Sequence, residues 1–146
     1  MTDYRQQSRE RGSAMLEFAL SVITLTFLFT GTFQYGYSFY VYNNLQTSIR
    51  SAARFASIQP YPTADFVSKT KNVAVYGKVA PNADDPPVAP GLDATKVNVN
   101  TVMGLNGAPA YVEVSVTGYV LSSLMGNWSL NGKPVATFIY MGHYQP

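Results

Sequence analysis

The hydrophobic and polar positions divide the chain into a polar start, a long apolar stretch and a mixed remainder. Residues 1–12 are mostly polar, and after Gly12 the sequence turns apolar, with Glu17 as the only charge near its start. Residues 18–33 are almost all Phe, Leu, Ile, Val, Ala, Thr or Ser. About 20 apolar residues suffice to cross a bilayer as a helix. The pattern therefore predicts a transmembrane segment over about residues 15–34.

A helical pattern continues beyond this apolar segment. No proline occurs from Ser13 to Gln59. Apolar residues recur there at the spacing of one helix face, namely Leu45, Ile49, Ala52, Ala53 and Ala56. We therefore predict a long N-terminal helix within residues 13–59, running from about Ser13 to Ser57, with Ser13 as the N-cap of an uncut chain. The Pro60 that follows cannot continue the ladder of hydrogen bonds.

The predicted helix also carries a group of tyrosines and a pair of arginines. Four tyrosines follow the apolar core and form a belt suited to a membrane–water interface: Tyr35, Tyr37, Tyr40 and Tyr42. Arg50 and Arg54 lie four residues apart and therefore share a face. Two interpretations of these arginines stay open, which are contact with a partner subunit or anionic headgroups, and simple solvation of the helix.

A second, shorter helix is predicted from an N-cap at Thr63 to Tyr76, with Gly77 as its stop. Its expected apolar face consists of Phe66, Val67, Thr70, Val73 and Ala74. A strand over residues 72–79 is the alternative. Residues 80–90 contain four prolines and two aspartates, and this composition predicts a loop.

The remainder alternates as strands do. The expected elements are a strand over 97–102, a turn over 105–109 centred on Asn106-Gly107, a strand over 111–120, an irregular or helical bridge over 121–126, a turn at Asn131-Gly132 and a strand over 134–141. Val112, Val114 and Val116 fall on one face. Residues 60–146 are thus predicted to form an α+β domain with a short helix and a small antiparallel sheet of about three strands.

Composition narrows the function classes. The 146 residues contain no cysteine and carry a formal net charge of +2, so neither disulfides nor a strong attraction to nucleic acid is expected. We see no nucleophile–base pair, no glycine-rich phosphate loop and no metal-ligand cluster. We therefore expect no enzyme activity and no cofactor or metal.

A few isolated polar residues are weaker candidates for a catalytic or metal-binding site. His143 is the only histidine and lacks the neighbours that a catalytic or metal site needs. Asp84, Asp85 and Asp93 could supply calcium ligands, but their spacing matches no EF-hand loop. We interpret these aspartates as solvated loop residues.

The charges at the start of the chain predict its orientation. Arg5, Arg9 and Arg11 precede the apolar segment, and no comparable basic cluster follows it until Arg50. The positive-inside rule then keeps the N-terminus cytoplasmic and sends residues 60–146 outward. The apolar segment ends without the small-residue cleavage site of a secretory signal, so we expect it to stay with the mature protein.

The sequence Gly12-Ser-Ala-Met-Leu-Glu17-Phe18 resembles the start of TadE-like proteins, which are minor pilin-like components of the tight-adherence (Flp) pilus machinery. Their motif is a glycine, four residues, then Glu and an aromatic residue. The stretches 51–56 and 75–77 and the valine-rich strand before Tyr119 are also similar to the family.

The resemblance implies a processed pilin-like subunit. Residues 1–12 would be a cytoplasmic leader that a prepilin peptidase removes between Gly12 and Ser13. Glu17 and Phe18 would serve membrane insertion and assembly. The expected partners are the peptidase, membrane lipid, other pilin-like subunits and pilus assembly proteins, and the expected location is the bacterial inner membrane or the pilus, with one membrane pass and a periplasmic C-terminal domain.

Glu17 is also a candidate functional residue on physical grounds, because burying a carboxylate in a membrane segment is costly. A cut after Gly12 would free the Ser13 amine one helical turn away, and the two charges would offset part of that cost. The alternative interpretation is an uncleaved, signal-anchored periplasmic binding module, with Glu17 reaching the headgroups. Gly31 and Gly36 are compatible with close helix packing and with tolerated breaks, and the sequence does not choose.

Overall fold

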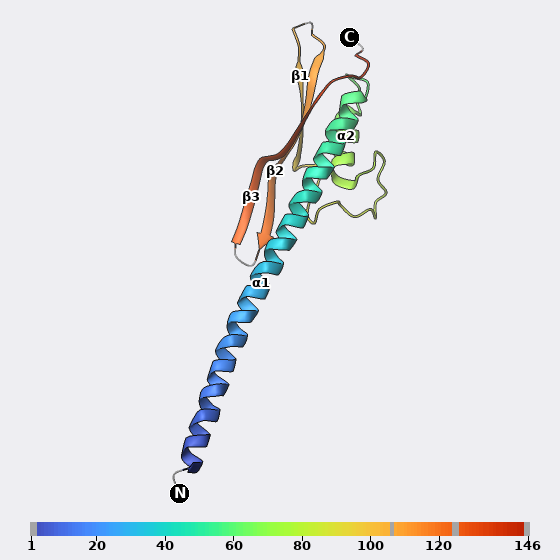
Figure 1. Ribbon diagram of the computed structural model, residues 1–146. Coiled ribbons are helices and arrows are strands. Elements are labelled where there is room, and N and C mark those ends of the chain that lie inside the picture. Colours follow the sequence, from blue (N-terminus) through green and yellow to red (C-terminus); the bar gives the residue numbers. More distant parts are fainter. Residues whose placement is uncertain (1–2, 106, 124–125, 145–146) are drawn as a thin grey trace. The chain divides into compact units, whose positions relative to one another are not determined.

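The computed structural model spans residues 1–146 and describes residues 3–105, 107–123 and 126–144, with side chains described from Gly12 onward. Its elements are α1 (Asp3–Ile58), α2 (Phe66–Tyr76), β1 (Val97–Met103), β2 (Pro109–Ser123) and β3 (Gly126–Ile139) (Figure 1). The predicted α+β class, with a long apolar helix, a short helix and three antiparallel strands, is confirmed. The chain divides into two compact units, one ending at Tyr37 and one beginning at Ser38.

The long helix begins earlier than the sequence predicted. The helix was predicted to begin at about Ser13, with Ser13 as its N-cap, but α1 starts at Asp3 and runs through Ser13. Both expectations were wrong for the uncut chain. Starting a helix is costly, whereas extending an existing one is not, and the arginines, glutamines and Glu10 of the leader are good helix formers.

In the second unit, α1 buries one face. All five residues of the predicted stripe, from Leu45 to Ala56, are fully buried, and Val41 joins them. The helix ends at Ile58, just before the predicted break at Pro60. Three of the five stripe residues are alanines, so this face lets other elements of the unit come close to the helix axis.

The second helix starts two residues later than expected. Asp65 occupies the N-cap position, and the Thr63 hydroxyl donates instead to the Pro60 carbonyl at 3.4 Å. Gly77 ends the helix as predicted, because its φ of 69° is left-handed and its N–H bonds the Val73 carbonyl at 3.0 Å. The helix excludes the alternative strand over residues 72–79.

The buried face of α2 differs from the predicted face at two positions. Phe66, Thr70, Val73 and Ala74 are buried as expected. Val67 is instead 45% exposed, and Val75 is fully buried. The buried Ser48 hydroxyl donates to the Ala74 carbonyl and so joins α1 to α2.

The sheet has the order β1-β2-β3, and both pairings are antiparallel. The alternation in the central strand was predicted correctly, since Val112, Val114 and Val116 are all fully buried. These side chains belong to the same core as the buried stripe of α1. Of the predicted Asn106-Gly107 turn, Asn106 lies outside the described residues, and Gly107 has the expected positive φ of 72°.

The second hairpin was predicted with the wrong turn. Residues 121–126 were expected to form a bridge and Asn131-Gly132 a turn, but β2 continues to Ser123 and β3 runs through both residues. Residues 124 and 125 lie outside the described part. The pairing register shifts on either side of Thr117, and Gly132 has a φ of 72°. The Asn131 side-chain oxygen accepts the Gly118 N–H at 3.0 Å, so the Asn-Gly pair forms a bulge inside the hairpin.

Residues 140–144 follow β3, and we call them the C-terminal strap. The Tyr140 N–H donates to the Ala110 carbonyl at 3.0 Å, which continues the sheet, and the Met141 N–H donates to the Ser57 carbonyl at 2.8 Å at the end of α1. A Cβ at Gly142 would collide with the Gln59 carbonyl, so only glycine fits there without a shift.

The Tyr140 hydroxyl closes the same junction. It donates to the Gln59 carbonyl at 2.7 Å and lies 3.1 Å from the His143 carbonyl. The Tyr61 N–H donates to that His143 carbonyl at 3.1 Å. Burial raises the pKa of the Tyr140 phenol above 10.0, and a backbone hydrogen bond from Tyr61 partly opposes this shift.

Leu45→Ala should lower the free energy of unfolding of the second unit by about 2–5 kcal/mol, because it leaves a cavity in a fully buried site. Urea unfolding of the full chain in detergent micelles, followed by the fluorescence of the single tryptophan, measures this loss. Val67→Ala is the control, because Val67 is 45% exposed and should change stability by less than about 0.5 kcal/mol. Equal effects of the two variants would contradict the core assignment.

Tyr140→Phe should cost about 0.5–1.5 kcal/mol of stability near neutral pH by removing one hydrogen bond. Because the folded-state pKa of Tyr140 is raised, its contribution is complete below pH 10 and is lost as the pH rises further. The stability difference between wild type and variant should therefore shrink above pH 10. Tyr111→Phe, at an exposed tyrosine, should keep the wild-type response, and a difference that is constant with pH would contradict this role.

Candidate functional site: the N-terminal segment of the long helix

The first unit presents apolar side chains without covering them. Every residue from Gly12 to Thr30 is exposed, including seven large leucine and phenylalanine side chains. Water-soluble proteins rarely expose so large a continuous apolar surface. Within the described part of the chain, α1 from Gly12 to Ile58 is the one helix long and apolar enough to cross a membrane. The predicted apolar segment therefore has the form of a membrane anchor.

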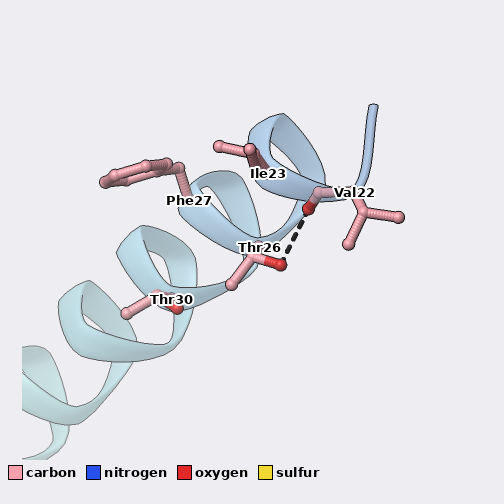
Figure 2. Close-up of a pocket in the computed structure, with 5 residues that line it drawn as sticks. All are labelled: Val22, Ile23, Thr26, Phe27 and Thr30. Atoms are coloured by element: carbon pink, nitrogen blue, oxygen red, sulfur yellow. Dashed lines mark hydrogen bonds between the residues drawn. The ribbon is translucent and has the colours of Figure 1, made fainter. Parts of the chain in front are cut away.

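The hydroxyls in this segment bond within the helix. Four of them donate to the backbone carbonyl four residues earlier, at 2.8–2.9 Å: Ser21 to Glu17, Thr24 to Leu20, Thr26 to Val22 and Thr32 to Leu28. Figure 2 shows one of these bonds, from Thr26 to the Val22 carbonyl. In hydrocarbon a polar group must find its partner inside the protein. These hydroxyls therefore add little cost to a membrane helix.

Two open hollows lie along this helix. One is lined by Val22, Ile23, Thr26, Phe27 and Thr30 (Figure 2). Its only side-chain polar groups are two threonine hydroxyls, so it offers packing surface and no chemistry. The other is lined by Glu17 with Leu20, Ser21, Thr24, Leu25 and Leu28. The carboxylate of Glu17 therefore borders a surface of otherwise uncharged side chains.

The predicted processing and assembly residues all lie on the first unit. Gly12, Ser13, Glu17 and Phe18 are exposed, and a Cβ built at Gly12 would meet no atom within 4 Å. Ser13 and Glu17 are four apart on a continuous helix, so they lie one turn apart on the same face. Among the side chains that the structure describes, none forms an ion pair with Glu17.

The other predicted residues lie in different surroundings. Arg50 and Arg54 belong to the second unit and are exposed, away from the buried stripe. In the tyrosine belt, Tyr35, Tyr37 and Tyr40 are exposed and Tyr42 is half-buried. Gly31 and Gly36 each have open space at the Cβ position, so no described part of this chain requires a glycine at either place.

Two of the three candidate aspartates, Asp85 and Asp93, are engaged in local structure. Asp85 pairs with Lys78 at 2.7 Å and accepts the Asn82 N–H at 2.8 Å, and these contacts lower the pKa of its carboxyl. The Asp93 carboxylate accepts both the hydroxyl and the N–H of Thr95, which together with Lys96 lowers its pKa to about 2. The part of the chain that the structure describes holds no group of three potential metal ligands.

One exposed residue received no role from the sequence. Trp128, the single tryptophan, lies on β3 and is 55% exposed. It sits within a stretch from Val114 to Gly132 that has no charged residue. The lack of charge in this stretch can be seen in the sequence. Because the turn was predicted at Asn131-Gly132, the stretch was not placed on the two strands of one hairpin.

Comparison with known proteins identifies the same segment. A family model described as "TadE-like protein" matches residues 12–54. The chain carries a TadE-like segment. This segment starts at Gly12, contains the exposed apolar residues 12–30 and ends within the buried stripe of α1. The TadE-like family implies involvement in tight-adherence (Flp) pilus systems. No curated protein and no solved structure matches the chain.

Proposed function

We propose that this protein is a pilin-like structural or assembly subunit of a tight-adherence pilus, processed by a prepilin peptidase between Gly12 and Ser13. The observation that carries the proposal is that the TadE-like match begins at Gly12 and runs along a helix whose apolar side chains are exposed. In this proposal α1 holds the subunit in the inner membrane and later packs against other subunits. Its partners are the peptidase, pilus assembly proteins and other pilin-like subunits.

The orientation of the subunit follows from charge. The basic leader of three arginines stays in the cytoplasm, and the second unit emerges in the periplasm. Moving the second unit to the periplasmic side leaves Gly12 near the cytoplasmic end of the apolar segment. A peptidase of the inner membrane would meet the scissile bond there.

The position of this bond inside α1 gives Gly12 a physical role. A peptide bond held in a helix must leave the helical conformation before a protease can cleave it, and α1 is continuous across Gly12 and Ser13. Glycine costs about 1 kcal/mol relative to alanine in a helix interior. Gly12 therefore marks a point where opening α1 is easy, as well as a small residue for the peptidase.

Cleavage would also change the surroundings of Glu17. The new amine of Ser13 would lie one turn from the carboxylate on the same face of α1. In an apolar environment a paired charge costs far less than an isolated one, and removing one partner of a buried pair costs several kcal/mol. In packed subunits, Glu17 would also lie in reach of the amine of a neighbouring subunit, which would set the stagger between them.

Gly12→Leu should block maturation while leaving the chain folded, because the Cβ position is open and leucine is a good helix former. Intact-mass measurement of protein purified from cells that contain the peptidase distinguishes a chain starting at Ser13 from one starting at Met1. Gly31→Leu is the matched control, since its Cβ position is also open in the same helix, and it should be cut normally. Wild-type protein that keeps residues 1–12 would refute the processing and favour an uncleaved signal anchor.

Glu17→Gln and Glu17→Ala should be inserted and cleaved, but both should fail to assemble, because the freed Ser13 amine then lacks its partner. The measurement is co-purification of the mature variant with other pilus subunits. Ser21→Ala is the control on the same face, since its hydroxyl bonds only within the helix, and it should assemble like wild type. Normal assembly of the glutamine variant would contradict the role of Glu17.

A further inference from the structure

The second hairpin has an exposed and uncharged end. We use "hairpin end" for residues 119–123 of β2 and 126–130 of β3. The surrounding sequence from Val114 to Gly132 has no Asp, Glu, Lys or Arg, although the chain has 18 of these residues. Trp128 is 55% exposed and Val120 is 48% exposed. Exposed strands of a water-facing domain normally carry charges, so this end is adapted to another environment.

The exposed side chains lie on both faces of the hairpin. Leu121 pairs with Trp128 and Val120 pairs with Ser129, and directly opposed residues of antiparallel strands point to the same face. Successive residues alternate between faces, so Val120 and Trp128 lie on opposite faces. A protein partner docked on one face would leave the other side chain in water. A surrounding medium would cover both.

Hydrogen bonds locate the hairpin end within the second unit. The opposite end of the sheet is tied to the C-terminal end of α1, through Tyr140 to Ala110 and Met141 to Ser57. From Ala110, β2 runs to Ser123 over about 40 Å, whereas the helix covers only about 28 Å from Ser57 back to Ser38. Figure 1 shows β2 and β3 running away from the C-terminus toward the end where they join.

Core contacts agree with this direction. Tyr119 donates its hydroxyl to the Pro90 carbonyl at 2.8 Å. Val88, two residues before Pro90, lines the same groove as Asn44 of α1. The hairpin end therefore lies at the end of the unit where α1 enters at Ser38.

We propose that the hairpin end rests in the headgroup region of the same bilayer that α1 crosses, with Trp128 at the membrane interface as a second attachment of the subunit. This inference rests on the membrane anchoring in the proposed function. The predicted membrane segment ends at about residue 34, and the second unit begins at Ser38. The end of the unit that contains Ser38 should therefore lie at the membrane surface. Tryptophan and tyrosine favour that interface, because their rings are apolar and their tips are polar.

Lipid fits this surface better than a protein partner does. The interface surrounds an inserted hairpin and covers Val120 and Trp128 together. It is also present whenever α1 is inserted, so the second contact is intramolecular and needs little intrinsic affinity. Phe39 and Tyr40, exposed at the start of the same unit, add aromatic surface at that level.

The single tryptophan makes the proposal directly measurable. The full chain is reconstituted in phosphatidylethanolamine–phosphatidylglycerol vesicles that contain lipids brominated at shallow or deep acyl positions. Trp128 fluorescence should be quenched more by the shallow bromines than by the deep ones. Acrylamide should quench Trp128 less than it quenches the tryptophan at position 135 of a Trp128→Phe, Val135→Trp variant. Trp128 that acrylamide reaches freely and bromolipids do not quench would overturn the proposal.

Two matched variants test the surface itself. Val120→Asp places a charge at the hairpin end and should reduce bromolipid quenching of Trp128 by roughly two- to fivefold, the population shift expected for a charge near a bilayer interface. Val135→Asp alters an equally exposed valine, 47% against 48%, near the other end of the sheet, and should leave quenching unchanged. Equal quenching in both variants would contradict the proposal.

A reporter in α1 separates this inference from the anchoring on which it rests. A Phe27→Trp, Trp128→Phe variant carries its only tryptophan in the predicted span and should be quenched most by the deep bromines. If this variant is quenched and wild-type Trp128 is not, the second attachment is wrong and the anchor stands. If neither is quenched, the anchoring itself is wrong. Protection of Trp128 that grows with protein-to-lipid ratio and occurs without bromolipid quenching would assign the surface to another copy of the chain and overturn the proposal.

Discussion

Unbroken backbone hydrogen bonding along α1 is the constraint on which the rest of the structure depends. A helix in hydrocarbon has no water to satisfy its backbone, so every peptide group must bond within the helix. The absence of proline from Ser13 to Gln59 meets this need. The same ladder then continues into the second unit, where one face of the helix forms part of a protein core. One backbone therefore serves two environments, and only the side chains change.

The core of the second unit combines small side chains from α1 with branched ones from β2. Small residues at Ala52, Ala53 and Ala56 bring the helix surface close to its neighbours, and the β-branched Val112, Val114 and Val116 supply bulk from the sheet. Such pairing of small with branched residues fills the core with few rotamers to fix. With no cysteine in the chain, this packing and the hydrogen bonds of the strap hold the unit together.

The features predicted correctly from the sequence were those with a strong period. The stripe on α1 and the valine alternation on β2 repeat over several turns or residue pairs, so one irregular residue does not hide them. The errors concern single local signals. Asn131-Gly132 has the composition of a hairpin turn, but pairing with Gly118 makes it a bulge, and only the tertiary register decides between the two. The start of α1 was predicted wrongly because an isolated leader would have to nucleate its own helix, which is costly. A leader attached to an existing helix only extends it, which costs little.

The same distinction applies to the candidate site. The Gly12–Glu17–Phe18 motif is contiguous on one helix, so the sequence alone placed these residues on the exposed segment. Trp128 depends on the hairpin register and on the direction of the sheet along α1, which no local pattern encodes. Its position at the end of the second unit therefore required the structure.

The C-terminal strap has a consequence for the order of synthesis and folding. Tyr140 meets Gln59 across 81 residues, and Met141 bonds to the end of α1. Residues 140–144 thus complete a unit whose first helix lies about 80 residues earlier in the chain. The chain must lose the conformational entropy of closing this long loop before the contact can stabilise it, and this slows folding. The contacts of the strap can form only after the chain has been made as far as Tyr140, so the second unit closes late in its own folding.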